Sequence, residues 1–192
     1  MNRRSADDSK KIIIDAALKT FSECGYDDAS MRMIAKKAGM SVGCLYLHFK
    51  NKDELCLMMM KGHFEDFLHS VKVAVDSAKD PVDALSAYIR SGIEHAKKHR
   101  ELFLAKSRKQ GFTFGIKLKK AFFAEQRNYL EDVIRKGIKS DNFNQCNVKE
   151  TAKIIMSVLR GFLFSMIVDP DNLFSHKECA KLLMEGLLKR NE

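Results

Sequence analysis

The sequence predicts an all-α protein of about nine helices, in which an N-terminal three-helix head with a helix-turn-helix precedes a larger helical body. Only two Pro and ten Gly occur among 192 residues, and few segments alternate strictly between apolar and polar residues. Apolar residues instead recur every three or four positions, which is the period of an amphipathic helix. Residues suited to cap helices, such as Ser30, Ser41 and Asp80, stand before several of these segments. A composition of 45% hydrophobic and 31% charged residues indicates a globular chain.

The first 77 residues are expected to form four helices. Capping residues and glycines set their limits, because Ser accepts hydrogen bonds at a helix start and Gly suits the residue after a helix end. Ile14, Ala17, Leu18 and Phe21 share one face of the first helix. The expected helices span about 7–25, 31–38, 42–49 and 52–77, with Ser30 and Ser41 as N-caps and Gly25 and Gly39 as ends.

The rest of the chain has the same helical character. Asp80 is suited to an N-cap and Pro81 to the first helical position, which fits the known preferences at helix starts. Two polar or glycine-rich stretches, "GFTFG" and "SDNFNQCN", read as connections between longer amphipathic segments. The expected body helices span about 81–99, 100–110, 116–137, 148–168 and 175–190.

The charge and cysteine content narrow the class of function. A formal net charge of +9 favours nucleic acid or another anionic surface as a partner. The five Cys form no Cys-x-x-Cys pair, so we expect neither a disulfide framework nor a zinc site, and a reducing cytoplasm fits best. No segment approaches the roughly 18 apolar residues of a membrane span, and residues 1–11 are too polar for a signal peptide.

Residues 31–49 fit a helix-turn-helix, whose second helix enters the major groove of DNA. Such a unit needs a small residue where the helices pack, a residue that tolerates positive φ in the turn, and an apolar anchor beneath the second helix. Ala35, Gly39 and Leu45 supply these features at offsets of 0, 4 and 10. We therefore expect residues of about 42–49 to be the recognition helix.

The chemistry around this helix suits DNA. Tyr46 offers a phenol hydroxyl and Lys52 an ammonium group near a helix start, and both are suited to phosphates. His48 could reach a base edge or a phosphate, and Phe49 is expected in the core. Small residues at the helix start would let its backbone approach the duplex: Ser41, Val42, Gly43 and Cys44. Arg3, Arg4, Lys10 and Lys11 form a basic arm that either touches the duplex or stays solvated.

The stretch "IIIDAALKTFSECGYDDASMRMIAKKAGMSVGCLYLHFKNKDEL" resembles the DNA-binding head of the TetR family of bacterial transcriptional regulators, over residues 10–57. The resemblance implies a DNA-binding domain over 1–55 and an effector-binding and dimerisation domain over 56–192. Cys44 and Leu47 depart from the family pattern at positions that bear on which bases are read. On this analogy the residues that contact operator DNA are Ser30, Ser41, Val42, Gly43, Cys44, Tyr46, His48 and Lys52.

The helix over 148–168 carries two apolar stripes, so we expect it to be buried on two faces. One stripe holds Ala152, Ile155, Leu159, Phe162 and Met166; the other holds Ile154, Val158, Gly161, Phe164 and Val168. The alternative is a central helix buried within a monomer. The family resemblance, which implies a dimer built from the last two helices, favours a homodimer with interface residues Leu159, Phe162, Met166, Leu183 and Leu187.

Phenylalanines gather in the body, where the resemblance implies an effector cavity. Each of them alone is also suited to ordinary core packing. Together they favour an apolar or aromatic small-molecule effector. The candidate pocket residues are Phe64, Phe67, Phe103, Phe112, Phe122 and Phe123.

Nothing in the sequence favours an enzyme. The six His are scattered, and there is no HExxH motif, GxSxG motif or Gly-rich phosphate loop. We expect no cofactor and no metal. The resemblance implies a cytoplasmic, nucleoid-associated homodimeric repressor that binds a pseudo-palindromic duplex operator and is released when an effector moves the fourth helix. The alternatives are an activator or co-ligand-dependent repressor of the same fold, or a dimerising adaptor that does not bind DNA.

Overall fold

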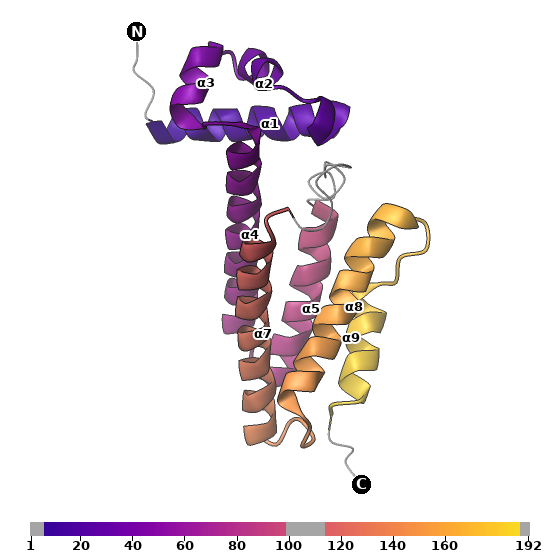
Figure 1. The fold of residues 1–192 in the computed structure, drawn as a ribbon. Coiled ribbons are helices and arrows are strands. Elements are labelled where there is room, and N and C mark those ends of the chain that lie inside the picture. The colour runs from indigo at the N-terminus through magenta and orange to yellow at the C-terminus, as the bar shows by residue number, and fades with distance from the viewer. Residues whose placement is uncertain (1–5, 99–113, 189–192) are drawn as a thin grey trace. The chain divides into compact units, whose positions relative to one another are not determined.

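The computed structural model describes residues 6–98 and 114–188, and within these ranges the chain is all-α, as predicted. The described part holds eight helices and no strand beyond an isolated bridge between Phe143 and Leu188. The expected helix over 100–110 lies outside the described residues, as do Arg3 and Arg4 of the basic arm. The helices are α1 (Ala6–Asp28), α2 (Met31–Lys37), α3 (Val42–His48), α4 (Lys52–Asp76), α5 (Pro81–Lys98), α7 (Ile116–Lys139), α8 (Val148–Val168) and α9 (His176–Glu185) (Figure 1).

The described residues divide into two compact units. The first contains residues up to Phe64 together with 114–116, and the second contains 65–98 and 117–188. Helices α4 and α7 therefore each begin in the first unit and continue in the second. The domain division after residue 55 stays a prediction.

The first unit has its own apolar core. Helix α2 packs against α1, and α3 packs against α2 (Figure 1). Helix α1 breaks at Gly25, whose φ of 78° is not helical, and one further turn runs to Asp28. The side chains buried at the centre come from all four helices: Ile13, Ala17 and Phe21 of α1, Ile34 and Ala35 of α2, Leu45 of α3, and Leu55 of α4.

In the second unit, α5 is the central helix. It packs against both α8 and α9. Asp80 caps its start, because the Asp80 carboxylate accepts hydrogen bonds from the backbone N–H groups of Val82 and Asp83 at 2.8 Å. Pro81 is its first residue, as predicted. Fully buried side chains at the centre of this unit include Tyr88, Ile89 and Ile93 of α5, Ile134 of α7 and Phe162 of α8.

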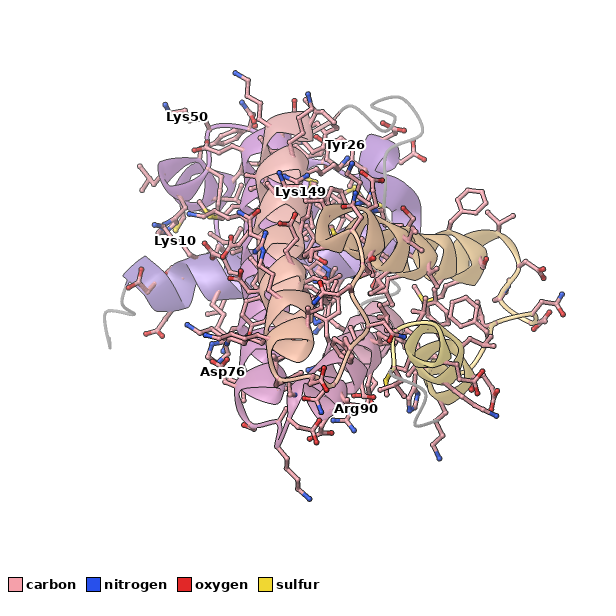
Figure 2. The ribbon with its side chains drawn as sticks, turned by 90° about the horizontal axis from the view of Figure 1, so that it is seen from below. Lys10, Tyr26, Lys50, Asp76, Arg90 and Lys149 are labelled. Carbon is pink, nitrogen blue, oxygen red and sulfur yellow. The ribbon has the colours of Figure 1, made fainter. Side chains whose placement is uncertain are left out.

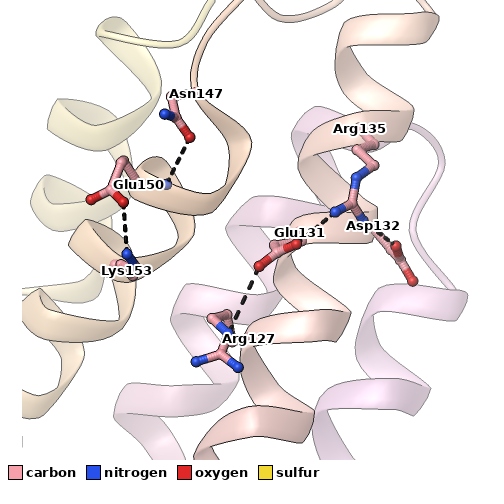
Figure 3. A network of polar contacts seen from close by, with 7 residues as sticks. All are labelled: Arg127, Glu131, Asp132, Arg135, Asn147, Glu150 and Lys153. Atoms are coloured by element: carbon pink, nitrogen blue, oxygen red, sulfur yellow. Dashed lines mark hydrogen bonds and ion pairs between the residues drawn. The ribbon is translucent and has the colours of Figure 1, made fainter.

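Polar contacts stabilise α7 and the start of α8 (Figure 3). The nearly buried carboxylate of Glu131 accepts a hydrogen bond from Arg135 at 2.6 Å and lies 3.8 Å from Nε of Arg127. Two guanidinium groups thus neutralise one carboxylate that is shielded from water. At the start of α8, the side chain of Asn147 accepts a hydrogen bond from the N–H of Glu150 at 3.2 Å. Among the described residues, no helix is both long and apolar enough to cross a membrane.

Candidate nucleic-acid interface

The two short helices of the head are capped as the sequence predicts. The Ser30 hydroxyl accepts a hydrogen bond from the Met33 N–H at 3.2 Å, at the start of α2. The Ser41 hydroxyl accepts one from the Cys44 N–H at 3.1 Å, at the start of α3. Each cap satisfies a backbone donor that has no partner within its helix. The hydrogen bonds of these two serine caps therefore set the residues at which α2 and α3 begin.

The turn between α2 and α3 is a glycine-dependent helix end. Gly39 has a φ of 65°, its N–H donates to the carbonyl of Lys36 at 3.2 Å, and the Met40 N–H donates to the carbonyl of Ala35 at 3.0 Å. This pair of bonds is the Schellman arrangement, which needs a left-handed residue at the position of Gly39. Ala35 and Leu45 are both fully buried, so the small contact residue and the apolar anchor lie where the motif requires them.

The exposed face of α3 lies on the opposite side of the helix from Leu45. At 3.6 residues per turn, Gly43 and Leu47 lie about 200° around the helix from Leu45, on the side away from the core. Leu47 is 86% exposed and Tyr46 is 50% exposed. A Cβ at Gly43 would approach nothing closer than Oγ of Ser41, at 4.0 Å, so this turn of the helix presents bare backbone. Another molecule can therefore approach the helix backbone closely at Gly43.

The structure brings seven of the eight predicted DNA-contacting residues onto α3 or the two caps. Ser30, Ser41, Gly43 and Tyr46 are exposed, and Val42, Cys44 and His48 are half-buried. Phe49 is buried, as predicted. Sequence reasoning treated Leu47 only as a departure from the family pattern and did not count it among the DNA contacts, although its position opposite Leu45 on the helix could have indicated that it is exposed. It also missed Met33 of α2, which is 43% exposed.

Lys52 is placed differently from the other seven. Its ammonium group donates to the backbone carbonyls of Tyr26 at 2.6 Å, Ala29 at 2.7 Å and Asp27 at 3.2 Å. The same nitrogen lies 4.4 Å from the centroid of the Tyr26 ring. An ammonium group has three N–H donors, and the three carbonyls account for all of them. The predicted contact between Lys52 and a phosphate would have to displace one of these bonds.

Three of the predicted pocket residues come together in the second unit. The Phe67 ring meets the Phe122 ring edge to face at 5.6 Å between centroids, and Phe122 lies 5.4 Å from Phe123. The Arg160 guanidinium lies 4.5 Å from the centroid of Phe123. Phe64 belongs to the first unit, and Phe103 and Phe112 lie outside the described residues.

The second unit also contains a cavity of about 200 Å³ with a partly polar wall. At its buried end the Tyr88 hydroxyl donates to the side-chain carbonyl of Gln126 at 3.2 Å, and burial raises the pKa of Tyr88 above its usual range. Burial and the adjacent Asp76 carboxylate raise the pKa of Tyr129 to about 12. Both phenols are therefore neutral hydrogen-bonding groups at pH 7. The cavity is lined by Leu68, His69, Val71, Lys72, Tyr88, Glu125, Gln126 and Tyr129, and none of the four predicted phenylalanines that the structure describes is among them.

Four of the five predicted interface residues are buried within the chain itself: Leu159, Phe162, Met166 and Leu187. Leu183 is half-buried. A side chain that is already covered by its own subunit has little surface left for a partner. The apolar residues that remain exposed on α8 and α9 belong instead to the other stripe of α8 and to the outer side of α9: Ile154 at 58%, Phe164 at 60%, Val168 at 62% and Leu182 at 68%.

Comparison with known proteins gives a consistent result. The family model described as bacterial regulatory proteins of the tetR family matches residues 13–59. An uncharacterized HTH-type transcriptional regulator of Bacillus subtilis, YhgD, is 27% identical, over 82% of this chain and 83% of its own. Among solved structures, the fatty acid degradation regulator FadR of Bacillus halodurans has a TM-score of 0.77 at 20% identity, over 100% of this chain and 99% of its own.

A second similar structure is that of SmeT, the repressor of a multidrug efflux pump of Stenotrophomonas maltophilia. In its complex with triclosan it has a TM-score of 0.78 at 21% identity, over 96% of this chain and 93% of its own. At this level of identity, the likeness to FadR and SmeT shows a shared fold.

The turn at Gly39 gives the first testable prediction. Replacing Gly39 by Ala should lower the free energy of unfolding by about 1–2 kcal/mol, because a residue with a Cβ is strained at positive φ. No atom lies within 4 Å of a Cβ at this position, so the backbone alone is the cause. Gly39→Asn is the matched control and should cost less, because Asn tolerates the left-handed conformation better. Urea denaturation of the three proteins measures the difference; equal losses for Ala and Asn would contradict this account of the turn.

Proposed function

We propose that this chain, a DNA-binding transcriptional regulator of the TetR family, acts as a homodimeric repressor of a pseudo-palindromic operator and is released by a small apolar or aromatic effector. The observation that carries the proposal is the complete helix-turn-helix, with both caps, the Schellman turn and the buried anchor in place. We place the protein in the cytoplasm, with the DNA that it binds.

The exposed side of α3 is the proposed reading surface. Gly43 lets the helix backbone approach the groove, and the Tyr46 hydroxyl is free to reach a phosphate from the helix flank. Leu47 is 86% exposed, and in the major groove an apolar side chain is matched by the methyl group of thymine. Ser30, Ser41, Val42, Cys44 and His48 complete the proposed contact surface.

The exposed apolar stripe of α8 and α9 is the proposed dimer interface. Ile154, Phe164 and Val168 lie on one side of α8, and Leu182 is exposed on α9. Gly161 lies between Ile154 and Phe164 with open space above it, so a partner helix could approach closely there. A two-fold axis through this stripe would give each dimer two recognition helices, which matches a pseudo-palindromic site. Stable interfaces of this kind bury about 1,200–2,000 Å² in total.

The effector is proposed to bind the second unit. The rings of Phe67, Phe122 and Phe123 offer aromatic contacts, and Gln126 offers an amide at the wall of the cavity described above. These groups suit a molecule with an aromatic or apolar body and one hydrogen-bonding group.

Two helices can carry a change in the second unit to the head. Helix α4 begins at Lys52 in the first unit and ends in the second, and α7 begins at Ile116 in the first unit. Directly before α7, the ring of Phe114 lies 6.1 Å from the ring of Tyr26 in the head. An effector releases DNA only to the extent that it prefers the state that does not bind, and about 1–3 kcal/mol of coupling is typical.

DNA binding is tested by selecting duplexes from a random pool with the full-length protein and titrating the enriched duplex by fluorescence anisotropy. We expect a two-fold symmetric sequence, and Tyr46→Phe should weaken binding by about 1.5–3 kcal/mol, the value of a hydrogen bond to a charged group. Ser77→Ala is the control, because it removes one exposed hydroxyl from the second unit. If no sequence is enriched, or if both variants bind like the wild type, the proposed role of α3 is wrong.

The interface is tested by sedimentation equilibrium. Phe164→Glu should convert a dimer into a monomer, because the symmetric interface would bury two carboxylates without partners. Val73→Glu places the same charge at another exposed apolar residue, 52% exposed on α4, and should leave the dimer intact. A Phe164→Glu protein that still sediments with twice the mass of one chain would exclude this stripe as the interface.

A further inference from the structure

We propose that Lys52 is a positioning residue for sequence-specific binding. Its ammonium group links the start of α4 to the chain segment directly before the helix-turn-helix and thereby sets the orientation of α3, instead of binding a phosphate. This inference rests on the proposed function, because it concerns how the same head reads DNA. It assigns to Lys52 a different role from the one that its place in the motif suggests.

The three acceptors of Lys52 come from one place in the chain. The carbonyls of Tyr26 and Asp27 are in the last turn of α1, beyond the break at Gly25, and the carbonyl of Ala29 lies in the connection to α2. Carbonyls at a helix end have no partner within the helix and need a donor from elsewhere. The Lys52 ammonium group donates to two such carbonyls and to that of Ala29, at 2.6–3.2 Å.

The location of these bonds explains why they would control α3. Ala29 directly precedes Ser30, the N-cap of α2, and Lys52 is the first residue of α4. Residues 30–51, which contain α2, the turn and α3, therefore form a loop whose two ends are joined through Lys52. A change at this junction alters the direction in which both short helices leave it.

A neighbouring contact holds the ammonium group in place. The Tyr26 ring lies 4.4 Å from Nζ of Lys52, which is the geometry of a cation–π contact, and the Tyr26 hydroxyl donates to the carboxylate of Asp53. Tyr26 itself is buried against Phe21, with 5.3 Å between ring centroids. Lys52 is thus half-buried and bonded on every N–H, unlike the exposed Lys50 two residues earlier (Tyr26 and Lys50 are labelled in Figure 2).

The two roles predict different binding data. A lysine that contacts a phosphate strengthens binding to any duplex, and its loss lowers the slope of log K against log salt by about 0.9. A lysine that orients α3 strengthens binding to the correct sequence alone, because only base contacts depend on the orientation of the recognition helix. The specificity ratio, which is the affinity for the enriched duplex divided by that for a scrambled duplex of equal length, separates them.

The test uses the full-length protein, with Lys52→Met and the control Lys50→Met, which removes the same charge from an exposed residue. Each protein is titrated by anisotropy against the enriched and the scrambled duplex at several salt concentrations. The temperature is one at which circular dichroism shows every variant fully folded. We expect Lys52→Met to lower the specificity ratio by about tenfold or more, out of the 10³ or more that is typical. The slope of log K against log salt should be as steep for Lys52→Met as for Lys50→Met, or steeper. Lys50→Met should keep the specificity ratio of the wild type.

Two results would overturn the inference. An equal loss of affinity for both duplexes, with a slope lower by about 0.9, would make Lys52 a phosphate ligand. An unchanged ratio in a folded protein would leave Lys52 with a role in stability alone. Lys52→Arg gives an independent readout if the Met variant does not fold: a planar guanidinium suits a phosphate but not three converging carbonyls, so the positioning role predicts a lowered ratio. A wild-type protein without preference for any duplex would instead overturn the proposed function, and this inference with it.

Discussion

The proposed reading surface on α3 depends on the burial of one side chain, which follows a glycine turn at a fixed spacing in the sequence. Leu45 is fully covered by the core of the head, and Gly39 turns the chain with a φ of 65° so that α3 can place Leu45 there. Once Leu45 is buried, the helical repeat leaves Gly43, Tyr46 and Leu47 on the outside. The caps at Ser30 and Ser41 then fix where the two helices begin. The specific chemistry of the surface is thus a consequence of packing on its opposite side.

The head was predictable from the sequence because its signals are local. Serine caps, a glycine at positive φ and an apolar anchor act on residues within about one turn of themselves, so their order along the chain is enough to place them. Lys52 shows the limit of such reasoning. Its acceptors lie 23 to 26 residues away in sequence, and no periodicity or motif indicates that three carbonyls would converge on it. The positive charge was visible in the sequence, but its partners were not.

The helices of the body could be predicted from the sequence, but which of their apolar faces are exposed could not. Periodicity gave α8 two apolar stripes, and nothing in the pattern distinguishes a stripe that faces the protein's own core from one that faces solvent. The structure buries the stripe of Ile155, Leu159 and Phe162 and exposes that of Ile154, Phe164 and Val168. The same limit applies to the phenylalanines: three of them pack together, whereas the cavity is lined by residues such as Tyr88 and Gln126 whose hydrogen bond closes its buried end.

The proposed chain of events connects these parts. An effector in the second unit would act on α4 and α7, and both begin in the unit that carries the helix-turn-helix. At the start of α4 the Lys52 ammonium group joins the end of α1 to the base of the two short helices. A shift at that point would change the direction of α3 without unfolding the head. Control of DNA binding would then need only a small movement at the residue where α4 begins.

We propose that two symmetric copies of α3 read the major groove, and methylation interference on the enriched duplex distinguishes this mode of binding from the others. Dimethyl sulfate modifies N7 of guanine in the major groove and N3 of adenine in the minor groove. If α3 is the recognition helix of a symmetric dimer, N7-methylated guanines will block binding in two half-sites related by two-fold symmetry. Their centres will lie about one helical turn or a multiple of it apart on one face of the duplex. Interference confined to adenine N3, or to a single unsymmetrical segment, would contradict it.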